Sequence, residues 1–275
     1  MVVQHNVTAM NANRQLGITT GIQAKSSEKL SSGYKINRAA DDAAGLAISE
    51  KMRRQVRGLT QASANAQDGI SAVQTAEGAL NEVHDMLQRL NELATKAAND
   101  TLTSDDRNYI KSEMRALTSE IDRTSAATEF NNQKLLDGSF TGKNLQVGTE
   151  TTTDDVIAIC IKKMSATGIG LSVGDDIDVS SNSAAQASLT QIKNAIISVS
   201  TQRADLGAIQ NRLEHTIKNL DNVAENTQAA ESQIRDTDMA QEMVRYSNNN
   251  ILAQAGQSML AQANQTNQGV LSLLQ

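Results

Sequence analysis

The strongest pattern along the chain is a run of apolar positions at alternate steps of three and four residues, which is typical of coiled-coil helices. We call this run the rod seam, and every position on it is apolar or glycine: Leu59, Ala62, Ala66, Gly69, Val73, Ala76, Leu80, Val83, Leu87, Leu90, Ala94 and Ala97. The seam predicts one uninterrupted helix over about residues 43–98. At 1.5 Å per residue such a helix would be roughly 80 Å long.

The same spacing predicts two further helices. After a polar break at residues 99–103, one face of a second helix carries Ile110, Met114, Leu117 and Ile121. Thr103 or Ser104 is suited to cap its start, because a short polar side chain can accept hydrogen bonds from the exposed N–H groups there. From residue 184 a third helix carries Ile192, Ile196, Val199, Leu206, Leu213, Ile217, Leu220 and Ala224 on its apolar positions, with Arg203 and Gln210 as polar interruptions.

Between these helices, residues 131–183 have a different pattern. This segment holds six glycines, and in the stretch VIAICI the residues Ile157, Ile159 and Ile161 would share one face of a strand. Such alternation between glycines predicts short strands and hairpins. The expected fold is therefore mainly α, a long antiparallel coiled-coil helical rod with a small β-hairpin region where the chain turns back.

The two ends of the chain are nearly free of charge. Arg14 and Lys25 are the only charged side chains in residues 1–27, and Arg245 is the only one after Glu242. Helices with so little charge are expected to pack among several neighbours, since surface charge is what keeps proteins apart. Large apolar residues are too sparse here to offset the entropy of ordering an isolated segment. We therefore expect both ends to be disordered in a solitary chain and to fold on assembly.

Composition narrows the classes of function. The chain has no proline or tryptophan, with only two Phe and three Tyr, so aliphatic side chains must form a core of packed helices. Its 31 acidic against 25 basic residues argue against a protein that binds nucleic acid without sequence preference. Cys160 is the single cysteine, which excludes an intrachain disulfide.

Export and membrane signals are also missing from the pattern. The first residues lack the basic-then-apolar order of a cleaved secretory signal. No apolar run approaches the roughly 18 residues of a membrane span, so we expect no membrane insertion. If the protein leaves the cell, it is expected to use a route that needs no cleaved signal.

Asp41 and Asp42 are the first candidates for chemistry, as an acid/base pair, a metal site or a helix cap. They lie where the charge-poor segment ends and the seam helix begins, with Gly33 and Gly45 on either side. A carboxylate at that place can accept hydrogen bonds from exposed N–H groups and interacts well with the helix dipole. The cap at a junction is therefore the favoured interpretation.

No other catalytic or metal pattern is found. His5, His84 and His215 lie on separate segments, and no HExxH motif pairs any of them. The stretch GDDIDVSSN alternates like a calcium loop but lacks the glycine at position six, and Ala187 replaces the glutamate at position twelve. We expect no enzyme activity, metal or cofactor. A self-assembling structural subunit is favoured over a signalling coiled coil or an enzyme.

Five longer stretches of the sequence resemble a known protein family. LSSGYKINRAADDAAGLAISEKM, GLTQASANAQDGISAVQTAEGALNEV and LQRLNELATKAAN closely resemble the N-terminal region of bacterial flagellin. RADLGAIQNRLEHTI and NILAQAGQSMLAQANQTNQGVLSLLQ resemble its C-terminal region. The matches cover about residues 1–140 and 185–275, so the variable outer domains of the family have no counterpart here.

The resemblance implies an extracellular filament subunit that is exported unfolded through the flagellar type III route. It implies an inner terminal-helix domain of residues 1–33 and 235–275, a connecting spoke of residues 34–45, and a rod domain of residues 46–234 with hairpins at about 131–183. Implied partners are other subunits, the flagellar export chaperone, and the filament cap and hook-junction proteins. The hook–filament junction protein is the near relative that remains as an alternative.

The resemblance also implies two contacts with host receptors. For the flagellin-sensing Toll-like receptor, the matching positions are Gln88, Arg89, Glu92, Leu93 and Glu113, with Arg89 and Leu93 on one helix face. For the cytosolic inflammasome sensor, the matching positions are Val270, Leu271, Leu273 and Leu274.

Overall fold

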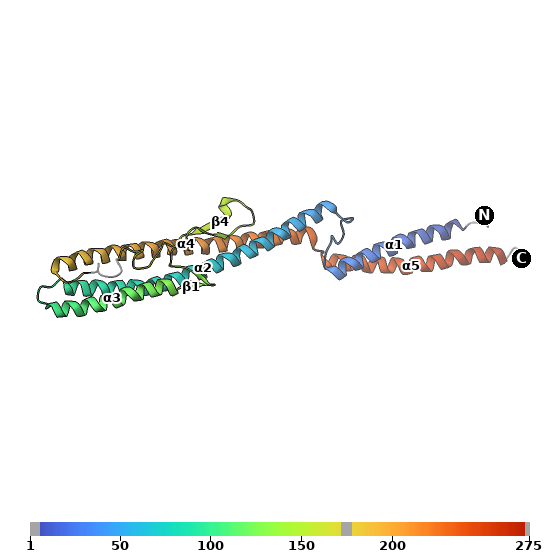
Figure 1. Ribbon diagram of the computed structural model, residues 1–275. Helices are drawn as coiled ribbons and strands as arrows, with labels where there is room; N and C mark the ends of the chain where they lie inside the picture. Colours follow the sequence, from blue (N-terminus) through green and yellow to red (C-terminus); the bar gives the residue numbers. More distant parts are fainter. Residues whose placement is uncertain (1–5, 172–177, 273–275) are drawn as a thin grey trace. The chain divides into compact units, whose positions relative to one another are not determined.

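The computed structural model describes residues 6–171 and 178–272, with side chains as far as residue 265. The described chain is mainly helical with two small antiparallel hairpins, which confirms the predicted fold class (Figure 1). It divides into two compact units, the first made of Met1–Val56 with Glu225–Gln275 and the second of Arg57–Ala224. The unit boundaries lie inside the helices α2, Ala43–Ala97, and α4, Asn182–Arg235.

The first unit contains the two terminal helices, α1, Val7–Ser32, and α5, Met239–Ser272, which pack along each other (Figure 1). Asn6 caps α1 by accepting a hydrogen bond from the Ala9 N–H at 3.0 Å, and its side-chain amide donates to the Ala263 carbonyl at 2.9 Å. Small residues let the two backbones approach closely. A Cβ at Gly256, for example, would lie 3.3 Å from Leu16 Cδ1.

The sequence predicts that both ends are disordered in a solitary chain, but in the structure both are helices that pack on each other. The pairing supplies the burial that a single segment lacks, as at Ala253 and Asn249. It covers only part of the apolar surface. Ten apolar residues of these helices remain between 44% and 65% exposed: Val7, Met10, Ile18, Ile22, Met239, Met243, Val244, Ile251, Leu252 and Met259.

The second unit is built on α2, α3, Ser104–Ala127, and α4. Contacts of α2 with α4 run antiparallel, because Glu77 pairs with Arg203 at 3.8 Å while Ser63 donates to Asp221 at 3.1 Å. Every position of the rod seam is buried, and its large members Leu80, Val83, Leu87 and Leu90 are fully covered. Met114 and Ile121 of α3 and Ile192, Val199 and Leu206 of α4 pack in the same core.

Two hairpins lie between α3 and α4. The first joins β1, Glu129–Phe130, to β2, Gln133–Lys134, through Asn131 and Asn132, whose φ angles are +49° and +60°. Asparagine tolerates this left-handed conformation better than most residues, and two-residue hairpin turns require it. The second pairs β3, Lys143–Gln146, with β4, Val156–Ile159, after a short 3-10 turn at Thr153–Asp155.

The hairpin region is anchored to the helices by both apolar and polar contacts. Ile157, Ile159 and Ile161 are buried while Ala158 and Cys160 are exposed, as the alternation predicts. Gln202 of α4, only 2% exposed, accepts from the Lys162 N–H at 3.3 Å and donates to the Cys160 carbonyl at 3.1 Å. These bonds satisfy a buried amide and fix the segment after β4 against α4.

None of the helices in the described part of the chain is long and apolar enough to cross a membrane.

The contact between the second hairpin and α2 can be tested by substitution. A methyl group at Gly69 would overlap Leu145 Cδ1 of β3, whereas Gly78 on the same helix has open space around it. We predict that Gly69→Ala lowers the free energy of unfolding by about 1–3 kcal/mol, the usual cost of overpacking. The control Gly78→Ala is expected to raise it by about 0.5–1 kcal/mol through helix propensity. Urea unfolding followed by circular dichroism measures both, and equal effects would contradict this packing.

Candidate functional site

The main candidate site is a charged cluster where α2 and α3 run side by side. Arg89 of α2 donates from Nε and Nη2 to Glu113 Oε1 of α3, at 3.1 and 2.8 Å. Its Nη1 also donates to Glu92 Oε2 at 3.0 Å. These carboxylates raise the pKa of Arg89, and the hydrogen bonds that Arg89 donates to Glu113 are the largest cause. About half of each partner's side chain in the Arg89–Glu113 pair is exposed, so the pair is available to a binding partner.

The sequence places these groups by their spacing from buried residues. Arg89 lies between the seam positions Leu87 and Leu90, and Glu113 directly precedes the buried Met114. Each charged side chain is thereby held at the edge of the apolar stripe of its own helix. The two edges meet where α2 and α3 pack.

Two other positions that the resemblance implies for receptor contact have different surroundings. Leu93 is only 3% exposed and belongs to the core, so of the two residues predicted to share a helix face only Arg89 is accessible. Packing of α3 over this turn of α2 covers it. Gln88 is exposed, and its amide nitrogen lies 2.9 Å from Nε2 of His84.

A recess of about 400 Å³ opens beside the cluster. Its lining includes Leu93 and Leu102 on the apolar side and Arg89 and Glu113 on the charged side. Tyr109 of α3, 76% exposed, lines the same recess and was missed by the sequence analysis. Its position four residues before Glu113 is the signal that could have found it, since such residues share a helix face.

The start of α3 forms one edge of this recess through a reciprocal cap. Asp106 accepts hydrogen bonds from the Thr103 N–H at 3.1 Å and from its hydroxyl at 2.7 Å, while the Asp106 N–H donates to the same hydroxyl at 3.3 Å. The Thr103 hydroxyl and N–H lower the pKa of Asp106. This arrangement is a capping box. Of the two predicted caps, Thr103 and Ser104, it is therefore Thr103 that caps α3.

Asp41 and Asp42 bind different groups at the junction in the first unit. Asp42 Oδ1 accepts from the Gly45 N–H at 2.9 Å, which is the contact of a residue that caps α2. Asp41 Oδ2 accepts from the N–H groups of Arg38 and Asn37, at 3.1 and 3.3 Å, and these bonds, Arg38 first, lower its pKa. Gly33 ends α1 at φ +77°, with its N–H bonded to the Lys29 carbonyl.

Several candidate positions cannot be placed. Val270 and Leu271 lie on the α5 backbone, but their side chains, and all of Leu273 and Leu274, are outside the described residues. His5 and residues 174–177 of the calcium-like stretch are outside them as well. Within the described chain, no group of three or more His, Cys, Asp or Glu side chains is arranged to hold a metal ion.

Two family models match most of the chain outside residues 142–188. The bacterial flagellin N-terminal helical region matches residues 3–141, and the bacterial flagellin C-terminal helical region matches residues 189–274. The chain belongs to the bacterial flagellin family. This confirms the resemblance drawn from its motifs, including the absence of a large insertion between the two matched halves.

Relatives of this flagellin match along their full length. A flagellin of Halalkalibacterium halodurans is 52% identical over 274 residues, and a flagellar filament core protein of Treponema maltophilum is 48% identical over 286 residues. Both alignments cover 100% of each chain. Such proteins are structural components of flagella rather than enzymes.

A solved structure extends the likeness of fold. A protein of Vibrio parahaemolyticus described as flagellar hook-associated has a TM-score of 0.58, is 16% identical, and matches 71% of this flagellin and 100% of its own chain. At that identity the likeness concerns the fold alone.

The lowered pKa of Asp106 predicts an acid-sensitive cap. A carboxyl group whose pKa is lower in the folded state stabilises that state fully above its unfolded pKa, near 3.8, and loses this effect as the pH falls through the folded value. Asp106→Asn should therefore reduce stability at about pH 6 and have little effect at about pH 2. Urea unfolding of α3 at both values, with Asp105→Asn as control, measures the difference. A variant equally destabilising at both would contradict the assignment.

Proposed function

We propose that this flagellin is the subunit of a flagellar filament used for motility and that α1 and α5 form its main polymerisation surface. The observation that carries the proposal is the set of exposed apolar side chains on these two helices, of which α5 has only Glu242 and Arg245 as charged residues. Covering one such side chain contributes roughly 1.5–3 kcal/mol, and the α1–α5 pair leaves ten of them between 44% and 65% exposed. Further copies of the same helices are the partners that suit this surface.

The surroundings of the filament follow from the same proposal. The subunit would leave the cell unfolded by the flagellar type III route and would reside outside it. Its expected partners are the flagellar export chaperone, which would hold the C-terminal segment, and the filament cap and hook-junction proteins. Because charge is so sparse on α1 and α5, these partners would recognise apolar rather than ionic surface.

Assembly can be tested with two isoleucines of equal exposure. Ile251 on α5 is 64% exposed and Ile197 on α4 is 62% exposed, but only Ile251 lies in a charge-poor helix. Ile251→Gln is expected to raise the critical concentration for filament growth about tenfold or more, since each buried copy loses roughly 1.5–3 kcal/mol. Ile197→Gln is expected to change it far less.

Electron microscopy after salt-induced assembly and sedimentation of the remaining monomer give the readout. Removal of residues 243–275 should abolish filaments while the second unit keeps its helical circular dichroism. Filaments from that truncated chain, or equal effects of the two glutamine variants, would overturn the proposal. Persistent monomers of the unmodified chain would instead favour a hook–filament junction role.

We also propose that the Arg89–Glu113 cluster binds the flagellin-sensing Toll-like receptor. The supporting observation is a partly exposed arginine, already oriented by two carboxylates, at the rim of a recess. Arginine is enriched among residues that dominate binding energy, and an ordered side chain loses less entropy on binding. By the same family relationship, Val270, Leu271, Leu273 and Leu274 are proposed contacts of the inflammasome sensor.

Receptor binding can be measured without a loss of folding. Arg89→Ala removes an exposed ion pair, and exposed pairs contribute little to stability. We expect it to weaken binding of the monomer to the isolated receptor ectodomain by at least about thirtyfold, the size of an interface hot spot. The control Arg123→Ala removes another exposed arginine of the same unit, whose pair with Glu120 is made within α3. Equal binding of the two variants would rule out the proposed contact.

A further inference from the structure

The C-terminus of α2 is closed by side chains from two other helices. A helix leaves its last carbonyl groups without partners inside the helix, and a glycine after the end often helps to satisfy them. Here Ala98 and Asn99 follow α2 instead. Arg107 of α3 takes this role, donating from Nη1 to the Ala97 carbonyl at 2.6 Å and from Nη2 to the Asn99 carbonyl at 3.0 Å.

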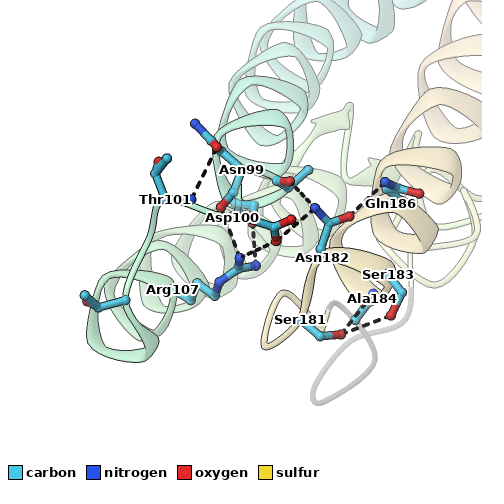
Figure 2. A network of polar contacts seen from close by, with 12 residues as sticks. Asn99, Asp100, Thr101, Arg107, Ser181, Asn182, Ser183, Ala184 and Gln186 are labelled. Atoms are coloured by element: carbon cyan, nitrogen blue, oxygen red, sulfur yellow. Dashed lines mark hydrogen bonds and ion pairs between the residues drawn. The ribbon is translucent and has the colours of Figure 1, made fainter.

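Asn182, the first residue of α4, completes the arrangement. Its amide nitrogen donates to the Ala98 carbonyl at 2.6 Å and to Asp100 Oδ1 at 3.1 Å. Asp100 also lies 3.6 Å from Arg107 Nη2. Figure 2 shows Asp100 between Arg107 and Asn182, so that one carboxylate touches side chains from two helices. We call Asp100, Arg107 and Asn182 the end clamp.

The end clamp is unlike the surface ion pairs of this protein. Arg107 is only 7% exposed, and a buried guanidinium must be fully paired to be tolerated. Its hydrogen bonds to the Ala97 and Asn99 carbonyls are charge-assisted, and together they fix the orientation of the guanidinium plane. By contrast, about half of each side chain in the Arg89–Glu113 pair is exposed, and such pairs add little to stability. The weaker pair therefore cannot determine how α3 lies on α2.

The clamp joins both helices close to the pair, and it adds a directional restraint to the apolar packing between them. Glu113 lies six residues after Arg107 along α3, and Arg89 lies eight residues before Ala97 along α2. A shift of α3 by one residue would move Glu113 by about 1.5 Å along the axis. That shift is enough to break hydrogen bonds of 2.8 and 3.1 Å, which weaken steeply beyond about 3.5 Å.

We propose that Arg107 is a positioning residue for the receptor-binding surface. It holds α3 in the axial position that brings Glu113 to Arg89, and it does so without touching the receptor itself. The binding part of this proposal rests on the proposed receptor contact of Arg89. The structural part, the dependence of the Arg89 hydrogen bonds on Arg107, can be measured without any receptor.

The first experiment measures the position of Arg89 directly. In the monomer, the side-chain Nε–H NMR signal of Arg89 reports its bond to Glu113. Arg107→Gln should shift this signal toward that of Glu113→Ala, in which the acceptor is absent. Arg123→Gln, a matched change of an exposed arginine on the same helix, should leave it unchanged. An Arg89 signal that does not respond to Arg107→Gln would overturn the proposal, whatever the receptor does.

The second experiment measures affinity for the isolated receptor ectodomain in a double-mutant cycle. Arg107→Gln is expected to weaken binding about tenfold in the unmodified background and not at all in the Arg89→Ala background, as for residues that act through one interaction. Arg107→Lys should be intermediate, since one ammonium group cannot match the planar guanidinium. An equal loss in both backgrounds would show a merely structural role and would contradict the proposal.

The variants also separate the two proposals and guard against misfolding. If Arg89→Ala leaves receptor binding intact, the receptor contact fails, while the NMR measurement still decides the role of Arg107. If circular dichroism shows that Arg107→Gln does not fold, Arg107→Lys takes its place. That change keeps the positive charge but cannot make both hydrogen bonds to the α2 terminus in the same geometry, and it should shift the Arg89 signal in the same direction.

Discussion

The second unit depends on the burial of one continuous apolar stripe along α2. From Leu59 to Ala97 every seam position is covered, although the chain has few aromatic side chains to fill space. Aliphatic side chains and alanines allow helices to pack closely over many turns, and each added turn extends the same core. The hairpins, the Arg89–Glu113 cluster and the end clamp all take their places from this packing. Arg89 and Glu113, for instance, meet only because Leu87, Leu90 and Met114 are turned inward.

Periodicity alone predicted the parts of the structure that follow from burial. The extents of the helices, the hairpin region and the inward face of Ile157, Ile159 and Ile161 agree with the sequence analysis. These features repeat along the chain, so neighbouring residues carry the information. Thr103 was also within reach, because helix caps depend on local sequence.

Features that depend on distant partners were missed. The sequence pattern does not distinguish Gln202 from other polar residues of α4. It is nevertheless buried, because its hydrogen-bond partners are backbone groups some forty positions earlier in the chain. Arg107 is similar, because its role depends on the end of another helix. Leu93 shares a helix face with Arg89, but packing of α3 covers it. The paired terminal helices likewise depend on a partner from the opposite end of the chain.

The placement of Cys160 has a practical consequence for spectroscopy of this flagellin. It is the single cysteine of the chain, its side chain is exposed directly after β4, and its carbonyl is bonded to Gln202 in the helix below. A dye or spin label on this thiol would be attached where the protein backbone is fixed to the second unit. Its anisotropy would therefore follow the tumbling of that unit, and the slowing of this rotation would report polymer growth in real time.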